Sequence, residues 1–332
     1  MKKIPLLPAA IAAMAGLYGV LPGALPGVHA QPHSSYPSKP VRMIVGFAPG
    51  GGTDVTARLI VQPLSDALGQ RVVIDNRPGA NGVLATEVTA RAPPDGYTLL
   101  MVNLGHTVNP GLYKKLPYDT MRDLAAVTLV VTLTNLLVVH PSLPAKSVAE
   151  FVRLAKARPG TIDYGSGGHG SSSHLAVELF AKTANIDLVH VAYKSGGLSA
   201  VALLSGEVAM SFNSIPSTLS YVKAGRLRAL GVSSLKRSLG VPDVPTIAEM
   251  GYPGFSASGI SGLVAPAGTP LDAIAKVHAE TAKVLKQPAV IDRLVALGMD
   301  PVGNTPAEFT QFIKADIEKW TRLTRELKLS LQ

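Results

Sequence analysis

Val45-Gly46-Phe47-Ala48-Pro49-Gly50-Gly51-Gly52-Thr53-Asp54 is the stretch that decides how this chain begins to fold. Residues 41–47 are apolar and β-branched, which predicts a short strand buried on both faces. The three glycines allow a tight turn, and Thr53 or Asp54 can cap the helix that follows. Free N–H groups and the helix dipole at such a start favour a carboxylate or phosphate oxyanion. The stretch alone leaves open whether this turn binds an anion or only connects a strand to a helix.

The glycine run does not match the nucleotide-binding motifs. A phosphate loop of nucleotide hydrolases needs Gly-Lys-Ser/Thr, and the dinucleotide fingerprint needs Gly-x-Gly-x-x-Gly. Neither pattern fits residues 50–53. Nucleotides are therefore disfavoured as ligands, and no cofactor is expected.

The first 30 residues have the pattern of a secretory signal peptide. Met1-Lys2-Lys3 precedes an apolar run over residues 4–25, and Val28-His29-Ala30 stands just before a polar stretch. Several prolines interrupt the run, which argues against a retained membrane helix. We expect cleavage after Ala30 and export of a soluble protein.

Composition limits the class of the mature protein. About 300 residues remain after cleavage, which is enough for two domains. The chain has no cysteine, so its fold cannot depend on disulfides in an oxidising compartment. Loss of Lys2 and Lys3 lowers the formal net charge from +9 to +7. The basic residues form no runs and few aromatic residues lie among them, which argues against a nucleic-acid partner.

The first part of the mature chain alternates apolar runs with helical patterns. The expected strands are 41–47, 71–75 and 97–102, and the expected helices between them are 54–68 and 83–91. Pro63 should kink or divide the first helix. This order requires right-handed crossovers and predicts a parallel sheet with helices on both faces, whose ligands lie beyond the carboxyl ends of the strands.

The second part of the chain repeats this design. Residues 124–140 form a long extended run, broken near Thr134-Asn135, that should cross from one domain to the next. Strand 162–166 leads into the glycine-rich turn 165–174 and a helix over 175–184, so two such turns could face each other across a cleft. Capping-box patterns at 147–150 and 246–249 predict two more helix starts.

The chain is expected to cross back along residues 255–266. Three helices should follow, over 271–286, 288–297 and 306–327, with no new strand, and should pack onto the first sheet. Trp320 on the last helix is expected in the core or on a domain surface.

Neither a metal centre nor a catalytic group is indicated by residue spacing. His169 and His174 are five residues apart in a polar loop, with no nearby cysteine and no flanking carboxylate, so no zinc site is expected. The mature chain contains no Gly-x-Ser-x-Gly. An acyl-transfer triad, which is defined by geometry, stays open. Asp54 could act as an acid, but its place at a helix start better fits a cap or a site that orders water.

Several short motifs occur in order along the whole mature chain. They are Tyr36-Pro37-Ser38-Lys39-Pro40, residues 47–54, Asn76-Arg77-Pro78-Gly79-Ala80, residues 94–100, residues 113–119, His140-Pro141-Ser142-Leu143-Pro144, residues 230–238, residues 241–246 and residues 265–270. Together they resemble the tripartite tricarboxylate transporter substrate-binding proteins, also called the Bug receptors.

The resemblance implies an α/β fold like that of the type II periplasmic binding proteins, with two doubly wound domains and a ligand cleft at the hinge. The expected domain 1 comprises residues 37–131 and 256–332, and domain 2 comprises residues 132–255. The resemblance implies that the protein works in the periplasm, where it captures a small carboxylate by Venus-flytrap closure and presents it to the permease subunits of a tripartite tricarboxylate transporter. The resemblance implies no enzymatic role, and we expect a monomer.

The resemblance also implies which residues bind the carboxylate. The first loop supplies Phe47, Ala48, Gly50, Gly51, Thr53 and Asp54. The matching loop of the other domain supplies Ser166, Gly168, His169, Ser171, Ser172 and His174. The loop at 103–107, with Asn103 and His106, and the end of strand 208–212, with Phe212 and Asn213, complete the expected pocket.

Three positions depart from the family pattern. The family usually has Asn at His169, Thr-Ser-Pro at 171–173 and Phe-Asp-Asn at 212–214. The missing acid at Asn213 removes a partner for a ligand ammonium group and lowers repulsion toward a second carboxylate. We therefore expect a ligand with one or two carboxylates and no amino group, aromatic acids included. A sensing subunit of a signalling receptor and an exported hydrolase on the same scaffold stay open as alternatives.

Overall fold

The computed structural model describes residues 36–50, 52–193 and 195–329. The expected signal peptide lies outside the described residues, as does Gly51 of the first glycine-rich loop. Within the described residues, eleven strands form one six-stranded and one five-stranded sheet. No helix in this part of the chain combines the length and the apolar character needed to cross a membrane.

The six-stranded sheet begins with the expected alternation of strands and helices. Its first three strands and their connecting helices are β1 (Val41–Val45), α1 (Gly52–Leu68), β2 (Val72–Asn76), α2 (Val83–Ala90) and β3 (Thr98–Asn103). β1 lies between β2 and β3 and is parallel to both. This arrangement is the doubly wound order 2-1-3, whose ligand side is the carboxyl end of the strands.

Three further strands make this sheet mixed rather than purely parallel. They are β4 (Leu124–Leu133), β10 (Gly259–Pro266) and β11 (Met299–Pro301). β10 runs antiparallel to both β3 and β4, and β11 runs antiparallel to β4. The expectation that the C-terminal part adds no strand was therefore wrong.

Alternating side chains of the central strands pack on opposite faces of this sheet. Met43 and Val45 of β1 belong to a core cluster with Ile60 and Leu64 of α1. Ile44 belongs to a different cluster, which includes residues of α2 and of the C-terminal helix. This period of two shows that β1 is covered by helices on both faces, as its apolar sequence predicts.

The five-stranded sheet repeats the order of the first. Its elements are β5 (Asn135–Val139), α4 (Val148–Ala157), β6 (Asp163–Ser166), α5 (Ser172–Ala184), β7 (Val189–Ala192), α6 (Gly196–Ser205), β8 (Met210–Ser214), α7 (Ile215–Lys223) and β9 (Arg228–Val232). β6 lies between β7 and β8 and is parallel to both. β5 then pairs antiparallel with β8 and β9, in the position that β10 occupies beside β3.

Thr134 alone separates β4 of the first sheet from β5 of the second. The predicted break in the extended run near Thr134-Asn135 is thus confirmed. The Thr134 hydroxyl donates to Oδ2 of Asp300 at 2.8 Å. Oδ1 of Asp300 accepts from the Ser238 hydroxyl at 3.0 Å and from the Leu239 N–H at 2.8 Å. One carboxylate of β11 therefore contacts both the β4–β5 junction and the segment that follows β9.

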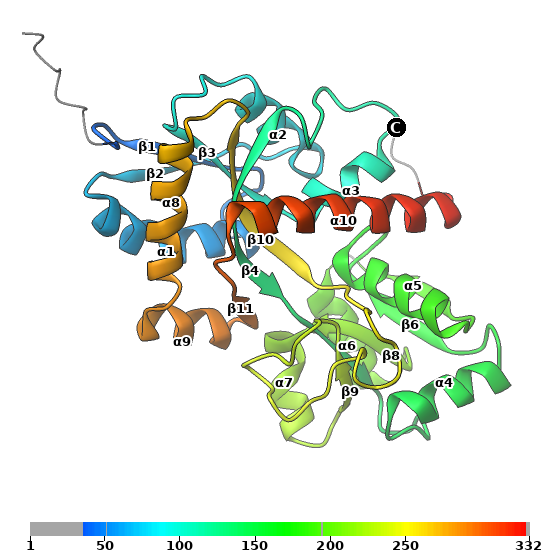
Figure 1. Ribbon diagram of the computed structural model, residues 1–332. Coiled ribbons are helices and arrows are strands. Elements are labelled where there is room, and N and C mark those ends of the chain that lie inside the picture. Colours follow the sequence, from blue (N-terminus) through cyan, green and yellow to red (C-terminus); the bar gives the residue numbers. More distant parts are fainter. Residues whose placement is uncertain (1–35, 51, 194, 330–332) are drawn as a thin grey trace, which may run out of the picture. The chain divides into compact units, whose positions relative to one another are not determined.

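The C-terminal helices cover the first sheet, as expected. They are α8 (Leu271–Val284), α9 (Pro288–Ala296) and α10 (Pro306–Glu326). Thr305 and Glu308 form a complete capping box with Pro306 at the first helical position. α10, drawn in red in Figure 1, packs along β4 and α3 (Gly105–Leu112). Trp320 of α10 is fully buried.

Three local predictions have a different or a partial outcome. α1 continues through Pro63 without a division, and the buried Ile60 and Leu64 hold it to the core on both sides of the proline; a kink at Pro63 stays a prediction. α3 forms where only a loop was expected. The Thr246–Glu249 capping box forms both hydrogen bonds but is followed only by turns. Gly251 with a φ of 101° ends that segment after one turn.

Candidate functional site

The loop between β1 and α1 is held in place by the carboxylate of Asp54. Oδ2 accepts hydrogen bonds from the Gly50 N–H at 2.9 Å and from Nε of Arg58 at 2.7 Å. Oδ1 accepts from Nδ2 of Asn76 at 2.9 Å, and the same nitrogen donates to the Phe47 carbonyl at 2.9 Å. Asp54 is only 1% exposed. Both of its oxygens are thus engaged by the protein, so its role here is to shape the loop.

The ionised form of Asp54 stabilises the fold. Burial alone would raise the pKa of this carboxyl, but hydrogen bonds from Arg58, the Gly50 N–H and Asn76 lower it below the ordinary value of 3.8. A carboxyl with a lower pKa in the folded state contributes stability above its unfolded pKa. That contribution is lost as the pH falls through the folded-state pKa.

Replacement of Asp54 by Asn should therefore lower the free energy of unfolding by an amount that depends on pH. At pH 7 we expect the variant to be less stable than the wild type by about 1–3 kcal/mol, since it loses hydrogen bonds to an ionised acceptor. The difference should narrow below about pH 4. Urea unfolding of both proteins from pH 7 to pH 3 measures it. Asp66→Asn, on the exposed side of α1, is the matched control and should cost well under ~1 kcal/mol at pH 7. If the stability difference between Asp54→Asn and the wild type stayed constant down to pH 3, the ionised form of Asp54 would not be the stabilising one.

The loop between β6 and α5 has the same construction. The Gly170 N–H donates to Nδ1 of His174 at 3.1 Å, with the four-residue spacing that joins Gly50 to Asp54. The Gly167 N–H donates to the Ser173 hydroxyl at 2.9 Å. Ser171 is the N-cap of α5 and accepts from the His174 N–H. In both loops a side chain from the first turn of a helix accepts a loop N–H.

A cavity of about 300 Å³ is lined by the first residues of both of these helices. Gly52 and Thr53 line it from α1, and Ser172 lines it from α5. Its other lining residues are Phe47, Asn103, Leu133, Thr134, Asn135, Ser214, Gly259, Ile260, Ser261, Leu297 and Gly298. Of the expected site residues, this cavity brings together Phe47, Thr53, Asn103 and Ser172. The N-terminal ends of two helices are favourable surroundings for an anion.

Two residues that line this cavity each carry a buried polar atom that lacks a protein partner within the described part of the chain. These atoms are Nδ2 of Asn135 and the hydroxyl oxygen of Ser261. Asn135 is 7% exposed and Ser261 is 1% exposed. An unsatisfied buried polar group costs about 1–3 kcal/mol, and the oxygen of a bound ligand can remove that cost. Sequence reasoning missed both residues. Asn135 could have been found, because the polar pair Thr134-Asn135 interrupts an apolar run. No local pattern marks Ser261 as a site residue.

No other described residue of the expected first-loop set lines this cavity. Ala48 and Gly50 are exposed, and Gly51 is not described. Asp54 points into the loop instead of the 300 Å³ cavity. Ligand contacts of these residues stay predictions.

The second-loop residues separate into two groups. His169 and Ser171 line another cavity, of about 510 Å³, together with Asn81 and Leu112. Ser166 and His174 are buried, and the Ser166 hydroxyl also bonds the Gly168 N–H at 3.1 Å. Their ligand contacts likewise stay predictions.

Phe212 and Asn213 lie inside the second sheet. Phe212 is fully buried, and its ring packs against Phe180 and Phe255. Asn213 is 2% exposed, and its Nδ2 donates to the Ser211 hydroxyl at 3.1 Å. The residue of this region that lines the 300 Å³ cavity is the neighbouring Ser214.

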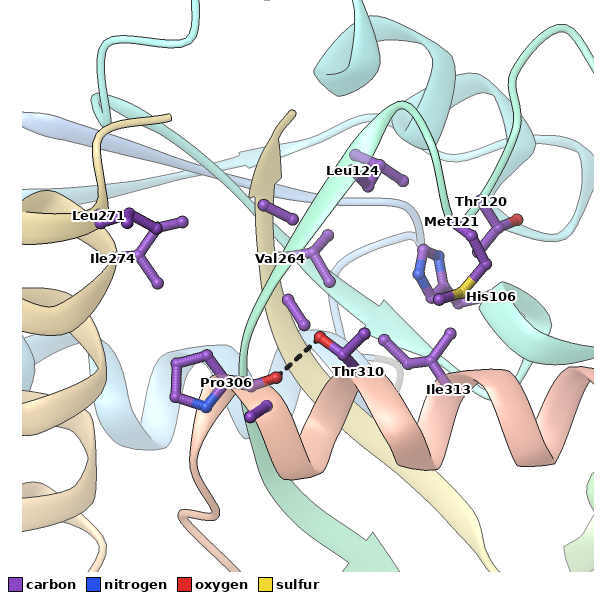
Figure 2. Close-up of a pocket in the computed structure, with 13 residues that line it drawn as sticks. His106, Thr120, Met121, Leu124, Val264, Leu271, Ile274, Pro306, Thr310 and Ile313 are labelled. Carbon is purple, nitrogen blue, oxygen red and sulfur yellow. Dashed lines mark hydrogen bonds between the residues drawn. The ribbon is translucent and has the colours of Figure 1, made fainter. Parts of the chain in front are cut away.

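His106 lies at the start of α3, between two cavities. With Phe47 and Asn103 it lines a small void of about 10 Å³. Figure 2 shows its ring beside Met121 and Thr120 at one end of a separate cavity of about 250 Å³, whose other labelled walls are mostly apolar. Neither ring nitrogen has a partner among the described residues. Burial lowers the pKa of His106 to about 4, so its imidazole is neutral at pH 7.

Comparison with known proteins gives a consistent result. A protein-family model described as "Tripartite tricarboxylate transporter family receptor" matches residues 56–329. Protein BugT of Bordetella pertussis is 38% identical over 300 residues, which cover 90% of this chain and 92% of BugT.

Two solved structures from Rhodopseudomonas palustris are also similar. Rpa4515 with adipate is 33% identical, with a TM-score of 0.70 over 87% of this chain and 97% of that protein. MatC with bound malate is 32% identical, with a TM-score of 0.67 over 87% of this chain and 99% of MatC. The similarity therefore extends along nearly the whole described chain.

Proposed function

This chain belongs to the tripartite tricarboxylate transporter receptor family, and we propose that it captures a small carboxylate and delivers it to the membrane permease of such a transporter. The observation that carries this proposal is the 300 Å³ cavity. The first residues of α1 and α5 line it, together with the unpartnered groups of Asn135 and Ser261. Hydrogen-bond donors and two helix dipoles suit an oxyanion, and the described lining includes no carboxylate side chain to repel one.

The ligands of two relatives support a dicarboxylate. Rpa4515 was solved with adipate and MatC with malate, and each of these acids has a carboxylate at both ends. For this chain we propose one or two carboxylates and no amino group, aromatic acids included. The described residues that line the 300 Å³ cavity include no carboxylate side chain that could pair with an ammonium group, which supports this choice.

The proposed binding mode uses two domains. We propose that residues 37–131 with 256–332 form one and residues 132–255 the other, each built around one of the two sheets. The chain passes between the sheets at Thr134 and again through residues 233–258. A ligand that contacts both loops favours the closed arrangement over the open one by its difference in affinity.

We propose that the protein works in the periplasm after removal of residues 1–30. The apolar run and Val28-His29-Ala30 support export, and the family of receptors to which the chain belongs supports a role without catalysis.

Calorimetric titration tests the proposed function directly. The protein, freed of copurified ligand by unfolding and refolding, should bind malate, adipate or an aromatic acid in the micromolar range at pH 7. It should bind glutamate much more weakly. Tight binding of acidic amino acids alone, or of none of these acids, would overturn the proposal. Incubation followed by mass spectrometry should recover the bound acid unchanged, and a converted product would instead support the hydrolase alternative.

A further inference from the structure

Three histidine side chains meet behind the second glycine-rich loop. His169 lies in the loop after β6, His174 in the first turn of α5 and His190 on β7. One ring nitrogen from each lies within 4.8 Å of those of the other two. The ring centroids of His174 and His190 are 4.2 Å apart, and those of His169 and His190 are 4.8 Å apart. The pairing of β6 with β7 brings His190 to this place, opposite Tyr164.

The second ring nitrogens of the two less exposed histidines face groups that can orient them. Nε2 of His190 is 2.6 Å from the Ser166 hydroxyl. Nε2 of His174 is 3.8 Å from Oε1 of Glu178, which accepts a hydrogen bond from the Tyr164 hydroxyl. In metal sites a histidine ligand usually donates its other N–H to a carboxylate, a carbonyl or water, and this bond sets the ring orientation. His174 and His190 each have such a partner on Nε2, whereas Nδ1 of His174 also accepts a hydrogen bond from the Gly170 N–H.

We propose that His169, His174 and His190 bind one divalent transition-metal ion, such as Zn²⁺. Imidazole nitrogens are the preferred ligands of Zn²⁺, Ni²⁺ and Cu²⁺, and three of them leave a fourth position open. Because Zn–N bonds are about 2.0–2.1 Å long, ligand nitrogens in a tetrahedral site lie about 3.4 Å apart. The three rings must therefore approach one another by about 1.4 Å at most from the 4.8 Å limit.

The loop can supply the movement of His169, whereas the stacked rings of His174 and His190, with 23° between their planes, must turn so that both lone pairs point at one ion. His169 is exposed, and it lies between Gly168 with a φ of 110° and Gly170 with a φ of 73°. Nδ1 of His174 accepts the Gly170 N–H in this structure, so the metal ion takes the place of that hydrogen bond. His169 also lines the 510 Å³ cavity, so the open metal position lies beside a space that water or a small ligand can enter. This proposal does not depend on the identity of the transported solute.

Metal titration of the untagged protein tests the inference. The protein is treated with a chelator, dialysed and titrated with ZnCl₂ by calorimetry and with CoCl₂ by visible absorption. We expect one Zn²⁺ per chain in the micromolar range and a Co²⁺ spectrum typical of tetrahedral coordination. Zn²⁺ should also raise the urea concentration at which the protein unfolds.

Variants distinguish this site from adventitious binding. His169→Asn changes an exposed residue and should lower the Zn²⁺ affinity by at least about tenfold, the loss that even an outer-shell partner causes elsewhere. His190→Gln should do the same. His140→Gln is the matched control, because His140 bonds Ser142 outside the cluster, and it should bind Zn²⁺ like the wild type. Absence of 1:1 binding, an unchanged affinity in His169→Asn, or an equal loss in His140→Gln would each overturn the proposal.

Discussion

Replacement of Asn135 by Asp is expected to weaken malate and adipate binding by at least about 100-fold at pH 7. The substitution keeps the shape of the side chain but exchanges a buried N–H₂ donor of the 300 Å³ cavity for an oxygen. A hydrogen bond to a charged ligand contributes about 1.5–3 kcal/mol. Two like charges about 4 Å apart repel by up to about 4 kcal/mol at an effective dielectric constant of 20. Either term alone is worth a tenfold change or more, at about 1.4 kcal/mol per factor of ten.

Calorimetry on purified proteins measures this effect. Asn185→Asp makes the same change at the exposed C-cap of α5 and should leave the affinity within a factor of about two. Asn135→Leu removes the donor without adding charge, and its smaller loss separates the hydrogen bond from the repulsion. If the wild type binds malate and Asn135→Asp binds it equally well, Asn135 is not part of the site. If the wild type binds none of the tested acids, the proposed function itself fails.

Replacement of Asp316 by Ala is expected to destabilise the protein by about 3 kcal/mol. Asp316 of α10 is 5% exposed. Its Oδ2 accepts from the Thr107 hydroxyl of α3 at 2.7 Å and from Nε1 of Trp320 at 2.9 Å, and its Oδ1 pairs with Lys319. The alanine variant leaves the buried Trp320 N–H without its acceptor and removes the ionised acceptor that Thr107 and Lys319 share, at the contact that joins α10 to α3.

Urea unfolding followed by circular dichroism measures this loss. Glu318→Ala, at an exposed position of the same helix, is the matched control and should shift stability by less than about 0.5 kcal/mol. Asp316→Asn keeps one acceptor oxygen, and its stability should lie between those of Asp316→Ala and Glu318→Ala. Equal midpoints for Asp316→Ala and Glu318→Ala would show that these hydrogen bonds contribute little.

Most strands and helices of this protein follow from local patterns, and the exceptions depend on tertiary contacts. β11 has only three residues, one of them Pro301, and is a strand because it pairs with β4. α3 contains Gly105, Pro110 and Gly111, which have poor helix propensity. It is stabilised by packing against α10 and by the bond from Thr107 to Asp316. Such partners lie more than 150 residues away in the sequence, beyond the reach of any window-based pattern.

The candidate site was likewise predictable where its residues follow a local pattern, and not where they depend on strand pairing. Thr53 and Ser172 stand at helix starts after glycine-rich turns, which local chemistry identifies. Ser261 reaches the cavity only because β10 pairs with both β3 and β4. His190 reaches the histidine cluster only through the parallel pairing of β6 and β7. For this reason His169 and His174 alone gave no indication of a metal site.

The repeated strand order and the repeated loop hydrogen bond amount to an internal duplication, with one copy in each half of the chain. The first copy holds its loop with Asp54 and the second with His174. A linear diacid has a matching symmetry, since it carries a carboxylate with two oxygens at each end. If each copy takes one end, the separation between the starts of α1 and α5 acts as a ruler for the number of carbons between the two carboxylates. Selectivity between acids as short as malate and as long as adipate would then be a matter of length more than of functional group.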